Sequence, residues 1–300
     1  MAIKFTVLVP VYNEAANITN LLTSLVKQKL LKGKLERIVV VASGCTDQTQ
    51  DLVKAWGKKD KKIKLLTQKK REGKASAINY FLKKDQSQVV VMVGGDLLLK
   101  DKALENLVRH FADKRVGMVG AKIVSTNKAD TFLGFANNVI WQLHDRMAQD
   151  HPRLGEVTAW RRVFERLPKE TICDEAEIEM MVKKAGLKLV FEPQAIAYNR
   201  GPTNLKEYLA RRRNNHLGHL LIQKRWGKKV ESEKVGLVAG YWWRQLLKDK
   251  KRWWWYLGLA FLEMVIKFLA LVDYYSGKKD QRQIVWPMAK SAKKPIKIKI

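Results

Sequence analysis

The sequence predicts an α/β fold with a mostly parallel central sheet flanked by helices, and two patterns in its first 125 residues support this. Short runs rich in Val and Ile are typical of strands buried on both faces, and they occupy residues 4–9, 37–42, 63–66, 89–93 and 116–123. Between them, apolar residues recur at steps of three and four, as in helices that begin near Ile18, Ala75 and Leu104. Strands and helices that alternate in this way predict right-handed crossovers between parallel strands. Ligands bind beyond the carboxyl ends of such strands, so the loops there should hold the chemistry.

The composition restricts the class of protein. A chain of 300 residues suits one large or two modest domains. Its 58 Lys and Arg residues against 29 Asp and Glu residues favour an anionic partner, such as nucleic acid, a phosphate-bearing ligand or an acidic membrane surface. The two cysteines are far apart in sequence, which predicts a reducing compartment with neither a disulfide framework nor a zinc site. The amino terminus lacks the pattern of a signal peptide, which predicts a cytoplasmic start.

The loop after the first predicted strand is Pro10-Val-Tyr-Asn-Glu14. At the carboxyl end of a parallel strand, Tyr12, Asn13 and Glu14 are placed to meet a ligand. A local explanation also stands, because Asn is a favoured helix-capping residue and Glu suits a first helical turn.

Two further loops carry small or cationic residues. The sequence Ser43-Gly-Cys-Thr-Asp47 leads into a helix whose free amides either meet a phosphate or are capped locally. Residues 69–74 contain Arg71 and Lys74 beside a glycine, and such cations either reach a diphosphate or form a solvated basic surface.

The loop after the fourth predicted strand is Gly94-Gly95-Asp96. Two glycines allow a close approach of the backbone, and a carboxylate is an oxygen ligand for Mg²⁺ or Mn²⁺. A simple turn is the alternative, although apolar residues on both sides make an idle Asp96 less expected.

The order and spacing of these motifs resemble those of the family 2 glycosyltransferases, which have the GT-A fold, over roughly residues 4–225. The family's Pro-x-Tyr-Asn-Glu, Gly-Lys-Ala-x-Ala-x-Asn and Asp-x-Asp motifs fall on residues 10–14, 73–79 and 94–96. Its Glu-Asp pair, whose second member is the usual catalytic base, aligns with Asp174-Glu175. Ala42 and Ser43 replace a family Asp pair of which one member contacts the nucleotide base, and Gly94 replaces the first Asp of the metal motif.

The resemblance implies an inverting glycosyltransferase that uses a nucleotide-diphosphate-sugar donor. In that role Glu175 would deprotonate the acceptor hydroxyl, Asp174 would support it, and Asp96 would hold Mg²⁺ or Mn²⁺ against the diphosphate. From the residues alone, the favoured interpretation of Asp174 and Glu175 is a helix cap that forms a solvated acidic turn with Glu177 and Glu179. The residues expected to bind the donor are Pro10, Tyr12, Glu14, Ser43, Arg71, Lys74, Gly95, Asp96, Arg211, Arg212 and Arg213.

The acceptor side is assigned to residues 155–162, which are predicted to form a strand and include Glu156 and Trp160. Trp160 would either stack on a sugar or be buried. Further on, His216 and His219 lie one helical turn apart, and a surface helix is favoured over a metal site because the remaining ligands are unidentified.

The last third of the chain has a different character. Residues 253–275 are long and apolar enough to cross a bilayer, with aromatic clusters at both ends. Glu263 and Lys267 argue against a lone span, because each costs about 2.5–3.5 kcal/mol at a helix centre, although their spacing lets them pair. Both flanks are basic, and residues 201–300 carry 23 basic and 7 acidic side chains, a net charge of +16. We therefore expect a helix lying in or dipping into an acidic leaflet, with a single crossing or a buried soluble helix as alternatives.

Together these observations predict a GT-A domain at residues 1–226 and a helical membrane-associating region with a basic tail at residues 227–300. The expected function is sugar transfer to a lipid-linked or polysaccharide acceptor at the cytoplasmic face of the membrane. A catalytically silent relative that binds nucleotide-sugar or scaffolds a membrane complex is the alternative. A nucleic-acid partner is not expected, because no recognised binding motif accompanies the charge.

Overall fold

The computed structural model describes residues 2–152, 154–228, 235–276 and 284–296. Its strands are β1 (Ile3–Val11), β2 (Gly33–Ser43), β3 (Ile63–Gln68), β4 (Val89–Val93), β5 (Leu98–Leu99), β6 (Val116–Ser125), β7 (Val157–Arg161) and β8 (Lys188–Asn199). Its helices are α1 (Ile18–Val26), α2 (Thr49–Lys59), α3 (Lys74–Lys84), α4 (Ala103–Val108), α5 (Phe132–Asp150), α6 (Asp174–Lys184), α7 (Leu205–Trp226), α8 (Val235–Lys248) and α9 (Trp253–Tyr275).

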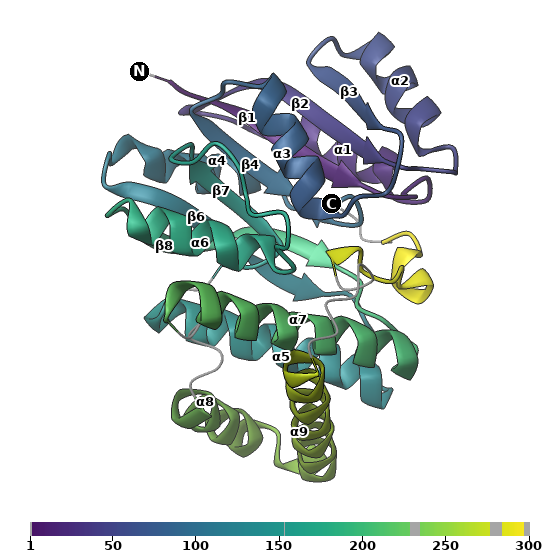
Figure 1. Cartoon of the computed structure of the whole chain (residues 1–300), viewed down its shortest axis with the longest axis vertical. Coiled ribbons are helices and arrows are strands. Elements are labelled where there is room, and N and C mark those ends of the chain that lie inside the picture. Colours follow the sequence, from purple (N-terminus) through teal and green to yellow (C-terminus); the bar gives the residue numbers. More distant parts are fainter. Residues whose placement is uncertain (1, 153, 229–234, 277–283, 297–300) are drawn as a thin grey trace.

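The strands form one sheet in the order β3-β2-β1-β4-β7-β6-β8-β5. Four of its seven neighbouring pairs are parallel, namely β1 with β2, β1 with β4, β2 with β3 and β6 with β8. Strand β7 is antiparallel to both β4 and β6, so it joins the parallel amino-terminal half to the second half of the sheet. The prediction of a mostly parallel sheet between helices is confirmed (Figure 1).

Apolar side chains cover both faces of the sheet. On one face, alternate β1 residues such as Phe5 and Val7 pack with Leu21 and Leu22 of α1. On the other face, Leu8 belongs to a second cluster with residues of α3 and α6. This double burial explains the continuous Val and Ile runs of the strands.

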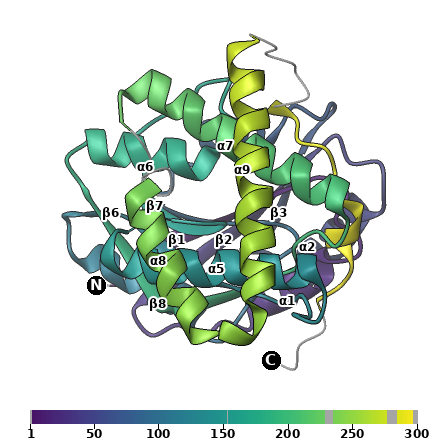
Figure 2. The same ribbon diagram turned by 90° about the horizontal axis from the view of Figure 1, so that it is seen from below.

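A further layer of helices contains α5, α7, α8 and α9, which lie below the sheet in the view of Figure 1. Thr131 caps α5 by accepting a hydrogen bond from the Gly134 amide, and Asn204 caps α7 in the same way from the Glu207 amide. Helix α9 runs across α7 with α8 beside it (Figure 2). Their shared core includes Phe135, Tyr208, Tyr256, Leu259 and Ile266.

Ion pairs as well as apolar contacts join α9 to α7. Arg212 of α7 donates two hydrogen bonds to Glu263 of α9, at 2.8 and 3.0 Å, and Arg213 forms an ion pair with Asp273. Glu263, at the middle of α9, therefore faces α7 and is held there by Arg212. Within the described residues, the segment Lys250–Tyr275 is the one helix long and apolar enough to cross a membrane.

Candidate active site

One large cavity, of about 1040 Å³, lies at the carboxyl ends of β1, β2 and β4. Its other walls come from the start of α6, from α5, α7, α8 and α9, and from residues 284–293. Thirteen residues assigned to catalysis, donor binding or the acceptor side line it: Pro10, Tyr12, Glu14, Ser43, Arg71, Lys74, Gly95, Asp96, Glu156, Asp174, Glu175, Arg211 and Arg212. Residues far apart in the sequence thus meet at one edge of the sheet.

The turn after β1 is held by polar contacts with the loop after β2. Asn13 has a positive φ of 51°, a left-handed conformation that Asn tolerates better than most residues. The Asn13 side chain exchanges hydrogen bonds with Thr46, through Nδ2 to Oγ1 at 3.0 Å and from the Thr46 amide to Oδ1 at 2.8 Å. The Glu14 amide donates to Thr49 Oγ1 at 2.8 Å. These contacts fix the turn, so Tyr12 presents its ring to the cavity.

Arg71 lies over the Tyr12 ring, with its Cζ atom 3.8 Å from the ring centroid. Burial lowers the pKa of Arg71, which nevertheless stays a cation because a guanidinium titrates far above neutral pH. Ser43 Oγ donates to the Lys70 carbonyl at 3.3 Å and so ties the loop of residues 69–74 to the end of β2. The cations of that loop are thereby brought to the cavity edge.

Gly95 is a position that only glycine can occupy without rearrangement. A Cβ atom there would lie 2.6 Å from Val11 Cγ1 and 2.8 Å from Glu14 Cγ. This close approach places the neighbouring Asp96 beside Glu14. Burial and the charge of Asp96 raise the pKa of Glu14 to about 7, against the opposing effect of Lys293.

The two candidate catalytic carboxylates begin α6 and share one cation. Lys74 Nζ lies 2.5 Å from Glu175 Oε1 and 2.9 Å from Asp174 Oδ2. Lys74 starts α3, directly after Gly73 with its positive φ of 89°. The assignment of Lys74 to the diphosphate stays a prediction, and in the structure its ammonium pairs with these two carboxylates.

The pKa values of Asp174 and Glu175 are shifted in opposite directions. Burial and the neighbouring Glu175 charge raise the pKa of Asp174 to about 7, although Lys74 opposes this. Burial alone would also raise the pKa of Glu175, but the Lys74 ammonium outweighs it and holds that pKa below its usual value. Glu175 is therefore ionised at neutral pH, as a general base must be.

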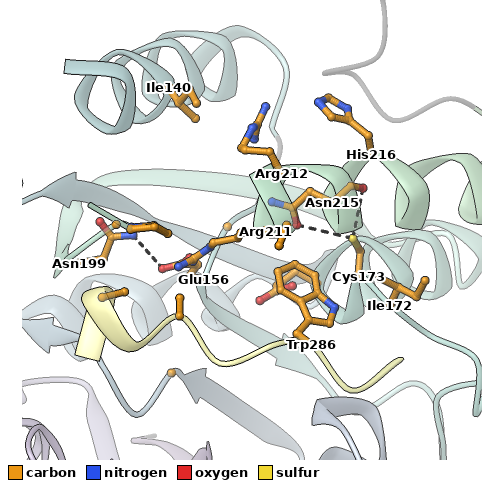
Figure 3. A pocket seen from close by; sticks show the side chains of 18 of the residues that line it. Ile140, Glu156, Ile172, Cys173, Asn199, Arg211, Arg212, Asn215, His216 and Trp286 are labelled. Carbon is orange, nitrogen blue, oxygen red and sulfur yellow. Dashed lines mark hydrogen bonds and ion pairs between the residues drawn. The ribbon is translucent and has the colours of Figure 1, made fainter. Parts of the chain in front are cut away.

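Glu156 precedes β7 and is held from two sides. It accepts a hydrogen bond from Asn199 Nδ2 at 3.0 Å and forms an ion pair with Arg211 of α7 (Figure 3). Burial raises the pKa of Glu156 despite Arg211, with further increases from the charges of Asp96 and Glu175. The pKa of Glu156 thus depends on the charges of both Asp96, the candidate metal ligand, and Glu175, the candidate base.

Two assignments made from the sequence need correction. Trp160 is fully buried in the centre of the sheet, opposite Val90 of β4 and Met118 of β6, so of the two alternatives burial holds, and its assignment to the acceptor side is wrong. Arg213 does not line the cavity, and its guanidinium pairs with Asp273 of α9. The assignment of Arg213 to the donor diphosphate is therefore not supported.

The histidine pair of α7 is also differently placed than expected. His216 and His219 are 6% and 7% exposed, so they do not lie on a surface helix. His216 Nε2 lies 3.2 Å from Glu263 Oε2, in a network that Tyr208 and Arg212 join. Burial would raise the pKa of Glu263, but Arg212 and His216 reverse this and hold it far below its usual value.

The carboxylates in the cavity fit a divalent cation whose remaining ligands are phosphate oxygens of the substrate and water. Among the residues that the structure describes, no group of three or more His, Cys, Asp or Glu side chains is arranged to hold a metal. Asp96 nevertheless lines the cavity, with Glu14 beside it. Mg²⁺ is commonly held by one or two carboxylates together with substrate phosphates, and this set meets that requirement.

One wall of the cavity carries no signal in the local sequence. Residues 284–293 bring the side chains of Trp286 and Lys293 to it, from a segment nearly 200 residues beyond Asp96. Trp286 points into the cavity between Cys173 and Arg211 (Figure 3). A basic tail was expected to lie on lipid, and its lysines carry no pattern that indicates a place in the site.

Solved structures of similar fold include nucleotide-sugar enzymes. Mannosyltransferase PcManGT from Pyrobaculum calidifontis, in complex with GDP-Man and Mn²⁺, has a TM-score of 0.68 and 22% identity, over 91% of this chain and 87% of that one. Glucosyl-3-phosphoglycerate synthase from Mycobacterium tuberculosis, in complex with Mn²⁺, UDP and phosphoglyceric acid, has a TM-score of 0.52 and 18% identity, over 76% and 80% of the two chains. At these identities the likeness shows the fold.

Sequence relatives agree with this architecture. The probable glycosyltransferase YdaM of Bacillus subtilis is 26% identical over 230 residues, 70% of this chain and 53% of its own length. Glycosyltransferase AglE of Haloferax volcanii is 26% identical over 121 residues, 40% of each chain. The chain thus spans about half or less of the length of these relatives. The family model described as glycosyl transferase family 2 matches residues 6–166, more than half of the chain, so this protein belongs to glycosyl transferase family 2.

Proposed function

We propose that the protein transfers a sugar from a nucleotide-diphosphate-sugar donor to an acceptor hydroxyl with inversion at the anomeric carbon. The observation that carries this proposal is the meeting of Asp96 and the Asp174–Glu175 pair in one cavity with the Tyr12 turn. A carboxylate that can hold a divalent metal and a general base serve the two halves of such a transfer, the departure of the diphosphate and the deprotonation of the acceptor.

Glu175 acts as the base in this proposal. Its carboxylate takes the proton of the acceptor hydroxyl while the acceptor oxygen bonds to the anomeric carbon. The bond from that carbon to the diphosphate breaks on the opposite side, and the nucleoside diphosphate leaves with the electron pair. Asp174 and Lys74 keep Glu175 ionised and oriented.

The donor would occupy the end of the cavity formed by Pro10, Tyr12, Ser43, Arg71 and Gly95. Mg²⁺ or Mn²⁺ bound at Asp96 would neutralise charge on the diphosphate as it leaves. Arg211 stands across from this end and adds a guanidinium, which suits phosphate. Complexes of the structural neighbours with GDP-Man or UDP and Mn²⁺ support this choice of donor and metal.

The far end of the cavity suggests an acceptor with a hydrocarbon chain. Its walls there are apolar side chains from three helices: Ile140, Leu143 and Met147 of α5, Val238 and Trp242 of α8, and Met264, Phe268 and Leu271 of α9. Met264 and Phe268 are also 60% and 65% exposed, so this end opens at the molecular surface. We therefore favour a lipid-linked acceptor over a polysaccharide, with its chain leaving between α8 and α9.

The surface around that opening is suited to lipid. Exposed apolar residues follow one side of α9, and they include Trp254, Leu257, Phe261, Met264 and Phe268. The opposite side of α9 is tied to α7 by the Glu263 and Asp273 ion pairs. A helix with one side bound to protein and one side apolar suits an in-plane position at a membrane better than a crossing. We retain residues 1–226 and 227–300 as the proposed catalytic and membrane-associating parts, at the cytoplasmic face.

A panel of nucleotide-sugars with Mn²⁺ or Mg²⁺ tests the proposal, scored for donor hydrolysis and for transfer to polyprenyl-linked or acyl-linked acceptors. Wild type is compared with Asp96→Asn and Glu175→Gln. Turnover that both variants lose supports the proposal, and full activity of Glu175→Gln refutes the assignment of the base.

A catalytically silent nucleotide-sugar binder is the second candidate. It is favoured by Gly94 in place of a metal-ligand carboxylate and by the engagement of Glu14 with Lys293. Binding of a nucleotide-sugar without turnover of any donor in the panel would establish it.

A further inference from the structure

The carboxyl-terminal residues 284–296, here named the strap, lie across the donor end of the cavity. In Figure 1 the strap is the yellow segment between the ends of the amino-terminal strands and α7. Ser291 joins it to α7, because its amide and hydroxyl both donate to Glu207, and the Thr203 amide donates to Ser291 Oγ at 3.0 Å. The strap therefore bridges the two halves of the site.

Lys293 fastens the strap to the Tyr12 turn. Its Nζ donates to the Tyr12 carbonyl at 2.7 Å and to the Asn13 carbonyl at 3.0 Å, and it forms an ion pair with Glu14. These three contacts use all three ammonium protons. Asn17 Nδ2 adds a hydrogen bond to the Lys293 carbonyl at 3.0 Å. Charge-assisted contacts of this kind are stronger than neutral ones, so Lys293 is the latch of the strap.

The other end of the strap uses groups assigned to the donor. Arg71 donates a hydrogen bond to the Trp286 carbonyl. The Ile284 carbonyl lies only 2.8 Å from the position of a Cβ atom on Gly73, so the strap backbone packs directly on the loop of residues 69–74. The Trp286 side chain fills cavity space beside Ile172 and Cys173 (Figure 3).

We propose that the strap and the nucleotide-sugar are alternative occupants of the donor end, and that an acidic membrane surface favours the open form by binding the strap lysines. The strap engages Arg71 and Glu14, which are both assigned to the donor, and its backbone covers the loop where the diphosphate is expected. This inference rests on the proposed donor binding.

The membrane part of the inference follows from charge and position. Residues 290–300 contain five lysines, and α9, with its exposed apolar side, ends at Tyr275 shortly before the strap. Anionic headgroups attract clustered lysines, and they compete for Lys293 with Glu14. Binding of the strap to lipid would release Arg71 and Glu14 for the donor.

Lys293→Ala tests the latch, and Lys294→Ala is the matched control because Lys294 is the neighbouring lysine and is exposed. The dissociation constants of UDP and GDP with Mn²⁺ are measured by calorimetry on the full chain. A strap that closes the site reduces the apparent affinity by the fraction of open molecules, so Lys293→Ala should tighten binding about three- to tenfold. Unchanged or weaker binding by Lys293→Ala would overturn the proposal.

Hydrogen exchange of the amides in residues 284–296 gives a readout that does not depend on nucleotide. These amides should exchange faster in Lys293→Ala than in wild type. They should also exchange faster in wild type on vesicles of phosphatidylglycerol and phosphatidylcholine than on phosphatidylcholine alone.

Equal exchange in the two proteins would refute the latch, and equal exchange on the two kinds of vesicle would refute release by lipid. If neither nucleotide binds to any of the proteins, the proposed function fails, while the exchange rates still decide whether Lys293 holds the strap.

Discussion

Replacing Lys74 with Met should move the pH dependence of the reaction upward. Lys74 is the cation that Asp174 and Glu175 share, at 2.9 and 2.5 Å. Without it, two adjacent buried carboxylates repel each other, and the ionised form of Glu175 becomes less favourable. Because the base must be ionised, activity at acidic and neutral pH should fall, and it should recover at alkaline pH.

The size of the shift follows from the geometry. An opposite charge a few ångströms away lowers a carboxyl pKa by about 1–3 units. The Lys74 side chain is 35% exposed, so solvent screens part of its effect. We therefore expect the acidic limb of the kcat/KM profile to rise by about one to two pH units, which corresponds to about 1.4–2.7 kcal/mol. Since the two carboxyls titrate as a pair, the observed limb belongs to both.

The assay is kcat/KM for turnover of a nucleotide-sugar across the pH range, and Lys69→Met is the matched control because Lys69 is an exposed lysine of the same loop. The control should keep the wild-type limb. If Lys74→Met scales the whole profile down without moving its acidic limb, Lys74 acts on the donor and not on the base.

Four other variants test the remaining assignments. Glu175→Gln should lower kcat by about 10²–10⁴-fold while calorimetry shows unchanged nucleotide binding, because it removes only the base. Asp96→Asn should weaken nucleotide binding in Mn²⁺ but not in EDTA. Glu263→Gln should lower the free energy of unfolding in urea by about 1–3 kcal/mol at neutral pH, since it removes the negative charge that the half-buried Arg212 guanidinium pairs with. The folded-state pKa of Glu263 is lowered, so its contribution is present above the unfolded-state pKa, and the difference from wild type should shrink as pH falls through the folded-state value. Phe261→Ser combined with Phe268→Ser should weaken flotation with acidic vesicles by about tenfold or more, because two exposed apolar side chains are lost.

Two outcomes would contradict these assignments directly. Wild-type metal dependence in Asp96→Asn would remove Asp96 from the metal site. Unchanged vesicle binding by the double Phe variant would show that α9 does not face lipid, and Val26→Ser and Leu31→Ser, on exposed positions at the opposite end of the chain, are controls that should leave flotation unchanged.

The fold was largely predictable because its signals are local. The predicted strand at residues 89–93 and the predicted helix at residues 253–275 coincide with β4 and α9. Both are continuous apolar runs that end at charged or glycine-rich sequence, so periodicity alone defines them. The turns after β1 and β4 were also predicted, because polar residues and glycines follow directly on apolar runs there, and the structure adds that Asn13 has a positive φ and that Gly95 has no room for a Cβ atom.

Side-chain direction was less predictable within an element. Adjacent residues of a helix point about 100° apart, so Arg211 and Arg212 reach the cavity while Arg213 reaches Asp273. The sequence shows three consecutive arginines and does not indicate which side of α7 faces the cavity. The burial of Trp160 was not predictable for a similar reason. Only the position of β7 between β4 and β6 reveals that the whole strand lies in the centre of the sheet.

Contacts between distant segments were beyond local patterns. Lys74 lies 100 residues before Asp174, and Lys293 lies 279 residues after Glu14. Each lysine was assigned a generic anionic partner, and in each case a carboxylate of the chain itself takes that place. Charge predicts that a lysine seeks an anion, whereas only the tertiary structure determines which one.

The ion pairs between α7 and α9 have a consequence for how far the enzyme can reach. They connect the helix proposed to lie in the membrane plane rigidly to the helix that carries Arg211, so the height of Glu175 above the lipid is set by protein contacts and not by the lipid. An acceptor would then be selected by the distance between its hydroxyl and the bilayer surface. The Arg212–Glu263 and Arg213–Asp273 pairs would in that case determine how far from the bilayer surface an acceptor hydroxyl must lie to reach Glu175.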